Sequence, residues 1–258
     1  ALVNLLQHGG TLPAVDPYSH TMPDWPWVEH AWLTDLIIGV FHSLFGALGV
    51  ILFFSVVTVG AWLVASLSVP CSRTYRLLAC ALSLWVALPF LGARTQMLTL
   101  LGLAVLLVIL ERSRKGGSRV LWLIPLLFLF WANLHGGFTA GFFLLGLVAA
   151  CSAIVRVSVL YAPGLAARLD EVILPWPAIG RLILAAGVAS LVTLVNPYGW
   201  RLYGEIIDSL SNQFMLDSLQ EWQPLSLNTL AGRSFALYLA GLGVAMAAWY
   251  RRMEPVRW

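Results

Sequence analysis

Five short polar clusters interrupt an otherwise apolar sequence and hold most of the side chains that could carry chemistry. They are DPYSHTMPDWPWVEH at 16–30, ARTQ at 93–96, NLHGG at 133–137, NPYG at 196–199 and EWQP at 221–224. Their carboxylates, imidazoles and guanidinium group are suited to transferring protons, holding a divalent cation or binding a phosphate. The same sequences are also typical of turns and helix ends, so a structural role stays open for each.

The first cluster contains the candidate catalytic groups Asp16, Glu29 and His30. A carboxylate held near a membrane surface can act as a general base toward an acceptor hydroxyl, or bind a divalent cation beside a phosphate leaving group. Spacing alone does not choose between these roles. Asp16 is followed by Pro17, which is equally a turn sequence.

Arg94 and His135 are the most informative residues of the later clusters. The planar donor fork of Arg94 suits a carboxylate or a phosphate, although a helix-end arginine can also extend its side chain to the membrane interface. His135 precedes two glycines, which allow close backbone approach. It can donate to a phosphate, transfer a proton or bind a metal, and the alternative is a histidine bonded locally at a helix end.

The elements that must position these groups are membrane helices. Of the 258 residues, 60% are hydrophobic and 10% are charged, and the mean hydropathy is +0.84. Soluble domains carry roughly a quarter charged residues, so the composition indicates lipid as the solvent. The net charge of +3 gives no support to nucleic-acid binding, and the three cysteines have no CxxC spacing. Neither GxxxxGK[ST] nor GxSxG occurs.

We predict an all-α protein, a polytopic transmembrane helical bundle. Residues 1–46 are expected to form an extracytoplasmic loop followed by a surface helix over 31–45, and residues 47–258 the bundle. About seven apolar segments have the composition of spans. They are residues 47–69, 77–92, 97–110, 120–132, 138–155, 180–195 and 234–250.

Lysine and arginine in short loops resist translocation, which predicts the orientation of the bundle. Twelve of the fifteen basic residues fall in alternate connections or in the C-terminal tail, namely Arg73, Arg76, Arg112, Arg114, Lys115, Arg119, Arg156, Arg168, Arg181, Arg251, Arg252 and Arg257. These parts are therefore expected in the cytoplasm, as is the C-terminus. The N-terminus and all five polar clusters then fall on the extracytoplasmic side.

Short apolar segments suggest that some polar clusters lie below the outer interface. Residues 120–132 and 97–110 would cover about 20 Å of a bilayer core roughly 30 Å thick. Asn133, His135 and Arg94 would then lie at membrane depth, where polar backbone needs surrounding protein or a water-filled cavity. This predicts a recessed cavity that opens outward.

Taken in order, DPYSHT, PWVEHAWL, ARTQ, NLHGG, NPYG and EWQP resemble a group of bacterial multi-span proteins similar to the GT-C superfamily of membrane glycosyltransferases. The resemblance implies a GT-C-like fold in the bacterial plasma membrane and a sugar donor carried on polyprenyl phosphate. It implies Asp16 or Glu29 as the catalytic acid, accompanied by His30. The residues it implies for binding the lipid phosphate or substrate are Arg94, Gln96, Asn133, His135, Asn196, Glu221 and Gln223.

Two departures from that group bear on catalysis. Its members usually have a first span and an acidic, tryptophan-rich motif upstream of the segment matching residues 1–13, and an upstream segment is therefore expected here. Ala31 stands where relatives often have glutamate.

Two functions follow from these expectations. The first is transfer of a sugar from polyprenyl phosphate on the extracytoplasmic side. The alternative is a non-catalytic membrane subunit of a larger complex, with a lipid or pigment in its cavity. Membrane lipids and other membrane subunits are the expected partners. The cofactor is left open, a divalent cation being one option, and no metal ligands are assigned.

Overall fold

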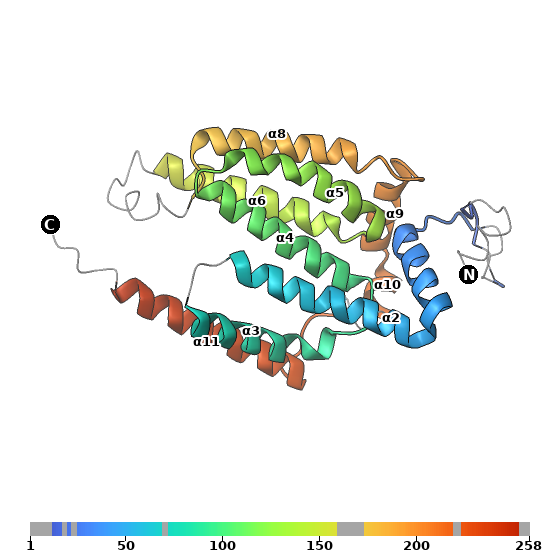
Figure 1. Cartoon of the computed structure of the whole chain (residues 1–258), viewed down its shortest axis with the longest axis horizontal. Coiled ribbons are helices and arrows are strands. Elements are labelled where there is room, and N and C mark those ends of the chain that lie inside the picture. Colours follow the sequence, from blue (N-terminus) through green and yellow to red (C-terminus); the bar gives the residue numbers. More distant parts are fainter. Residues whose placement is uncertain are drawn as a thin grey trace. The chain divides into compact units, whose positions relative to one another are not determined.

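The computed structural model describes residues 12–16, 20–21, 25–68, 72–158, 173–218 and 223–252, which are mostly helical (Figure 1). The helices are α2 (Trp32–Ser68), α3 (Arg73–Ala87), η1 (Leu88–Phe90), α4 (Gln96–Arg114), η2 (Ser118–Trp122), α5 (Leu123–Leu134), α6 (Phe138–Ser158), α8 (Trp176–Val192), α9 (Arg201–Ser211), α10 (Gln213–Ser218) and α11 (Leu230–Arg252). An isolated antiparallel bridge joins Val15 and Pro26, and the described residues contain no strand. The predicted all-α class is confirmed.

The chain divides into two compact units. The first comprises residues 1–70 and 92–208, and the second comprises residues 71–91 and 209–258. In the second unit α11 packs against α3. The candidate site lies in the first unit.

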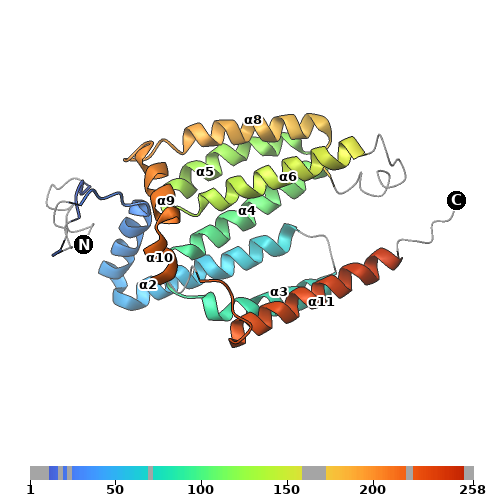
Figure 2. The same ribbon diagram turned by 180° about the vertical axis from the view of Figure 1, so that it is seen from behind.

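Five helical segments of the first unit lie side by side (Figures 1 and 2). They are the second part of α2, then α4, η2 with α5, α6 and α8. Helix α4 contacts α2, α5 and α6, and α8 contacts α5 and α6. The second part of α2, α4 and α6 run in one direction, and α5 and α8 run in the opposite direction, so the starts of α4 and α6 lie at the same end as the ends of α5 and α8.

Trp131 lies at the centre of this packing and is 2% exposed. A Cβ atom at Gly102 of α4 would lie 2.6 Å from its indole ring, and one at Gly141 of α6 would lie 2.8 Å from it. Real Cβ atoms do not approach that closely, so the two glycines are needed for α4 and α6 to close around the tryptophan. Phe128 packs on the same indole with its ring centroid 5.5 Å away.

Helix α2 is broken at Gly46, which has φ 62° and ψ −155° (Figure 1). This conformation is accessible essentially only to glycine. It separates residues 32–45 from the apolar segment 47–68, and the figure shows the two parts pointing in different directions. The predicted separate helix over 31–45 is therefore present, beginning at Trp32. Its position on a membrane surface stays a prediction.

Among the described residues, four helices are long and apolar enough to cross a membrane, namely those within Trp32–Ser68, Gln96–Arg114, Phe138–Ser158 and Leu230–Ala248. Two shorter apolar helices cover Ser118–Leu134 and Trp176–Val192. A helix overlaps each of the seven predicted spans, but the count of seven stays a prediction.

The short span predicted over 97–110 is wrong, because α4 has 19 residues and continues to Arg114. The additional turn is charged, and Glu111 stabilises it by ion pairs with Arg114 and Lys115 one turn later. A helix of this length can cross the apolar core. The inference that Arg94 lies at membrane depth, which rested on a short span, is therefore withdrawn.

The break at Gly46 gives a first testable prediction. Gly46→Ala forces a side chain into a conformation that costs about 1–3 kcal/mol, and we expect a lower melting temperature in detergent. Gly60→Ala is the matched control, because Gly60 lies inside the same helix, has open space around its Cα and no positive φ. Equal melting temperatures for the two variants would contradict a required break at Gly46.

Candidate functional site

Four segments meet at one end of the first unit, which we call the motif end. They are residues 29–35 around the start of α2, residues 94–99 at the start of α4, the α5–α6 connection 133–137, and the α8–α9 turn 193–201. Hydrogen bonds described below join the segments to one another. We call the opposite end, with residues 111–119, Arg156 and the start of α8, the basic end.

Asn133 ties three of these segments together. Its Oδ1 accepts a hydrogen bond from the Trp32 indole N–H (2.8 Å), and its Nδ2 donates to the carbonyls of Leu129 (2.8 Å) and Val195 (2.9 Å). Asn133 is 7% exposed, so leaving any of these partners unpaired would cost free energy. Both polar atoms of its amide are engaged, which gives Asn133 a structural role at this end.

A second bond holds the start of α2 in place. The hydroxyl of Thr34, which is fully buried, donates to the carbonyl of Leu134 (2.6 Å). This carbonyl is one of the last of α5 and lacks a partner within its own helix. The first turn of α2 is therefore fixed against the C-terminal end of α5 by two side chains, Trp32 and Thr34.

His135 lies in the α5–α6 connection, and its hydrogen bonds define its tautomer. The Gly137 backbone N–H donates to Nδ1 (3.0 Å), so Nδ1 carries no proton in the neutral ring and the hydrogen is on Nε2. The Thr99 hydroxyl is 2.8 Å from the same Nδ1, and the Trp131 indole N–H donates to that hydroxyl (3.3 Å). Burial lowers the pKa of His135 from 6.5 to about 4, and the charge of His30 acts in the same direction.

Glu29, His30 and Asp35 lie next to this connection. The His30 and His135 ring centroids are 6.1 Å apart in an edge-on arrangement. A Glu29 carboxylate oxygen accepts a hydrogen bond from the Ala31 N–H (3.4 Å). Asp35, in the first turn of α2, is half-buried and within electrostatic range of both Glu29 and His30. Glu29 and Asp35 thus lie close to His30, which in turn lies against His135.

The NPYG sequence forms the α8–α9 turn. Asn196 accepts from the Tyr198 N–H (2.8 Å) and donates to the Thr193 carbonyl (2.7 Å), so its amide stabilises the turn itself. Burial raises the pKa of Tyr198. Its hydroxyl oxygen is buried beside the Glu29 backbone and makes no hydrogen bond of normal geometry with the described residues. The turn thus places a phenol next to Glu29.

Arg94 and Gln96 lie at the start of α4, and both are exposed. The Arg94 N–H donates to the Gly92 carbonyl (2.9 Å), which forms part of the turn before the helix. Thr99, which contacts His135, lies in the first turn of the same helix, so Arg94 is at the motif end. Its side chain is on the surface of that end.

Three other predicted site residues differ in where the structure places them. Asp16 is half-buried next to the antiparallel bridge between Val15 and Pro26, and its N–H donates to the Trp25 carbonyl (2.9 Å). Glu221 lies outside the described residues. Gln223 belongs to the second unit, where its amide donates to the carbonyls of Leu216 (2.7 Å) and Asp217 (2.9 Å).

The described residues contain no group of three or more histidine, cysteine, aspartate or glutamate side chains that could hold a metal ion. Carboxyl and imidazole groups, of the kinds found at Glu29, His30, Asp35 and His135, are the side chains that most often transfer protons in proteins.

Sequence reasoning missed Asp35, Thr99 and Tyr198. Asp35 is not among the predicted site residues, although it follows Ala31 by one helical turn and so faces the same side as the PWVEH segment. Thr99 stands alone in an apolar run, so only its contact with His135 reveals it. Tyr198 belongs to the NPYG sequence, and the formation of a turn is enough to explain the residues of that sequence.

No protein family matches the sequence, and no curated protein or solved structure matches it either. The fold and the site therefore define a class only, an all-helical protein whose described part has four helices long and apolar enough to cross a membrane and a polar site at one end of its first unit.

Neighbouring glycines at the α5–α6 connection give a second prediction. A Cβ at Gly137 would overlap the Thr99 hydroxyl and lie 2.8 Å from His135 Nδ1, whereas one at Gly136 would meet His30 at an ordinary 3.5 Å. We expect Gly137→Ala to break the Thr99–His135 contact and cost about 1–3 kcal/mol, and Gly136→Ala to be nearly neutral. Thermal unfolding in detergent measures both. Equal stability of the two variants would contradict the described packing.

The lowered pKa of His135 gives a third prediction. The unfolded chain binds a proton between pH 6.5 and about 4 that the folded chain excludes, so stability present at neutral pH is lost as the pH falls through this window. Lowering the pH from 7 to 5 costs about 2 kcal/mol at this residue. We expect the melting temperature of His135→Gln to depend less on pH than that of the unaltered protein. His42→Gln, at an exposed position, should keep the pH dependence of the unaltered protein.

Proposed function

We propose that the protein is a GT-C-like membrane glycosyltransferase that transfers a sugar from polyprenyl phosphate to an acceptor hydroxyl. The observation that carries the proposal is the convergence of Glu29, His30, Asp35 and His135 at one end of an apolar helical unit. Proton transfer from an acceptor hydroxyl needs a base at the surface where a lipid-linked donor presents its sugar. The opposite end of the unit carries the basic residues.

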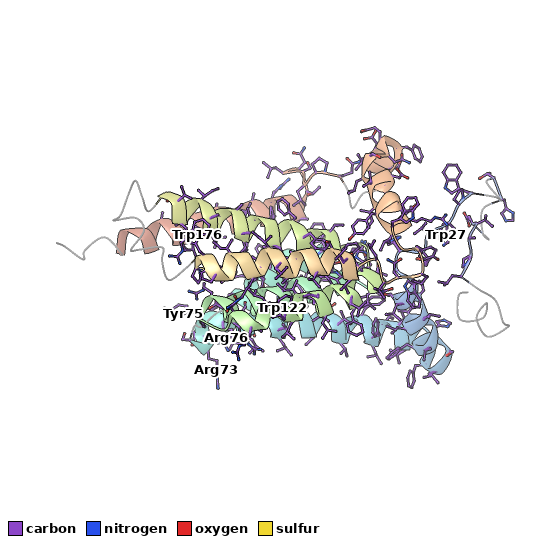
Figure 3. The ribbon with its side chains drawn as sticks, turned by 90° about the horizontal axis from the view of Figure 1, so that it is seen from above. Trp27, Arg73, Tyr75, Arg76, Trp122 and Trp176 are labelled. Carbon is purple, nitrogen blue, oxygen red and sulfur yellow. The ribbon has the colours of Figure 1, made fainter. Side chains whose placement is uncertain are left out.

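The proposed location is the bacterial plasma membrane, with seven spans and the motif end outside the cytoplasm. Exposed tryptophans support two interfaces, because they gather at the level of lipid headgroups. Trp25 and Trp200 belong to the motif end, and Trp122 and Trp176 to the basic end. Figure 3 shows Trp27 and Trp176 toward opposite ends of the first unit. Arg112, Arg114, Lys115 and Arg119 at the basic end support a cytoplasmic position for that end.

In the proposed reaction the acceptor oxygen forms a bond to the anomeric carbon as the bond from that carbon to the phosphate oxygen breaks. The acceptor hydroxyl proton passes to a carboxylate, Asp35 or Glu29, and polyprenyl phosphate leaves with the bonding electrons. The exposed guanidinium of Arg94 is placed to bind the leaving phosphate. His135 is neutral and has an Nε2–H donor, and it positions the substrate rather than removing the proton.

The structure changes which residues we assign to this reaction. Asp35 joins Glu29 and His30 as a candidate for proton transfer. Asn133 and Asn196 hold segments of the motif end in place, since their amides are engaged with backbone and indole groups. Asp16 stays a candidate, because its backbone hydrogen bond to Trp25 joins it to residues 25–30.

Carboxyl substitutions test the proposal. The purified full chain is incubated with labelled polyprenyl-phosphate sugars, and transfer to membrane acceptors is measured. We expect Asp35→Asn or Glu29→Gln to lower kcat/KM by about 10²–10⁴-fold, the usual contribution of a general base. Asp217→Asn is the matched control, because Asp217 is an exposed acid in the second unit. Its transfer rate should equal that of the unaltered protein.

Two results would contradict the proposal. One is an absence of transfer by the unaltered chain with every donor. The other is full activity in both carboxyl variants. A melting temperature measured for each variant separates loss of chemistry from loss of fold.

A non-catalytic subunit is the second candidate function. Helix α11 favours this second function, because only 11% of the most apolar part of the helix is buried within the chain. A surface this exposed fits contacts with lipid or with other membrane subunits. Co-purification with defined membrane proteins, together with an absence of transfer activity, would support this alternative over the first.

A further inference from the structure

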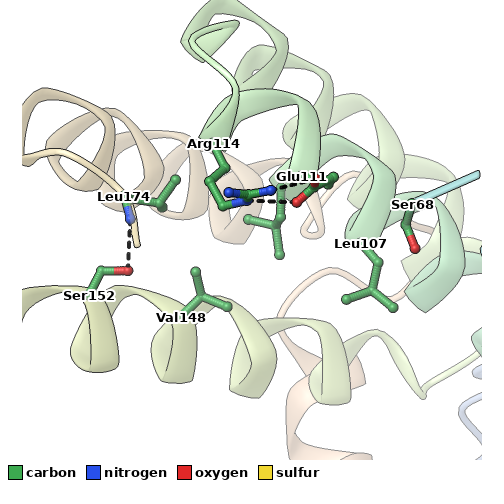
Figure 4. A pocket seen from close by; sticks show the side chains of 8 residues that line it. Ser68, Leu107, Glu111, Arg114, Val148, Ser152 and Leu174 are labelled. Carbon is green, nitrogen blue, oxygen red and sulfur yellow. Dashed lines mark hydrogen bonds and ion pairs between the residues drawn. The ribbon is translucent and has the colours of Figure 1, made fainter. Parts of the chain in front are cut away.

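A cavity of about 260 Å³ lies at the basic end of the first unit (Figure 4). It is lined by Ser68, Leu107, Leu110, Glu111, Arg114, Val148, Ser152 and Leu174. The α4 residues that line the cavity, Leu107 to Arg114, lie 11 to 18 residues beyond Gln96 at the motif end, which places the cavity roughly 17–27 Å from that end. It is therefore separate from the candidate site described above.

The walls of the cavity are apolar and are fixed by hydrogen bonds. Leu107, Leu110 and Val148 contribute aliphatic surface from α4 and α6. Leu174 is held on both sides, because its N–H donates to Ser152 Oγ (3.3 Å) and its carbonyl accepts from Arg156 Nε (3.1 Å). Figure 4 shows the Ser152–Leu174 bond beside the cavity. The shape is thus set by the protein's own contacts.

Basic residues lie beside the cavity at the end of α4. The Glu111 carboxylate accepts from Arg114 Nε (2.8 Å) and Nη2 (2.7 Å) (Figure 4), and Lys115 Nζ is 3.1 Å from the same carboxylate. Glu111, the one acid among the described lining residues, is therefore already balanced. Residues 111–119 contain four basic side chains against this one acid.

We propose that this cavity holds one acyl chain of an anionic phospholipid, with the headgroup phosphate against the basic residues beside the cavity. Pockets for drug-sized molecules are roughly 300–1,000 Å³, so a cavity this small suits a single narrow chain better than a soluble metabolite. Basic pockets between membrane helices attract anionic headgroups. The apolar walls match the acyl chain of such a lipid, and the basic residues beside the cavity match its headgroup phosphate.

Lipid retention tests the proposal. The purified full chain is equilibrated with vesicles of phosphatidylglycerol or of phosphatidylcholine, and bound lipid is counted by native mass spectrometry. We expect one phosphatidylglycerol to be retained in preference to phosphatidylcholine. Leu107→Trp fills the cavity and should abolish that retention, and because Leu107 is partly exposed the larger ring does not overpack the core. Leu126→Trp, at an exposed position on α5, is the matched control and should retain the lipid.

A charge variant adds a second readout. Lys115→Gln removes one positive charge beside the cavity and should weaken phosphatidylglycerol binding by about fivefold, since each basic residue near a membrane surface contributes about 1 kcal/mol. Equal retention in Leu107→Trp and Leu126→Trp would overturn the proposal. So would binding that does not distinguish phosphatidylglycerol from phosphatidylcholine. Sugar transfer at the motif end is measured separately, so neither outcome depends on it.

Discussion

The Asn133 side chain is the contact on which the arrangement of the motif end depends. A buried amide in an apolar bundle has no water to bond, so each of its groups must find a partner in the protein. Here those partners are the Trp32 indole and the carbonyls of Leu129 and Val195. They come from α2, α5 and the end of α8. One polar residue thereby fixes the relative positions of three helix ends, because any displacement would leave a buried group unpaired.

The position of His135 follows from this constraint. Asn133 anchors the end of α5, and the chain turns two residues later, where His135 meets Thr99 of α4 and the Gly137 N–H. These contacts use Nδ1, and burial keeps the ring neutral. The proton-accepting capacity of the motif end therefore lies with Glu29, Asp35 and His30, on the segment that Trp32 holds in place. Structural and chemical roles are divided between neighbouring residues of the same motifs.

Hydropathy and the distribution of arginine predicted the apolar helices and the gathering of residues from four of the five motifs at one end of the first unit, but not α9 and α10. The pattern is strong because apolar segments and charged loops obey separate physical rules. It did not predict that α4 continues to Arg114, because local ion pairs extend a helix beyond its apolar segment. Nor did it separate Asn133 from His135 in function. Both are polar residues at a helix end, and only their partners distinguish them.

The absence of charge between the two ends restricts what the first unit can do. Residues 47–68, 97–110, 120–134, 138–155 and 182–192 contain no aspartate, glutamate, lysine, arginine or histidine. A transporter needs polar groups near the middle of the membrane that can be reached from both sides. The five segments supply no charged group for such a path. The groups capable of proton transfer lie at one end, so chemistry at a membrane surface fits this unit better than movement of a polar solute through it.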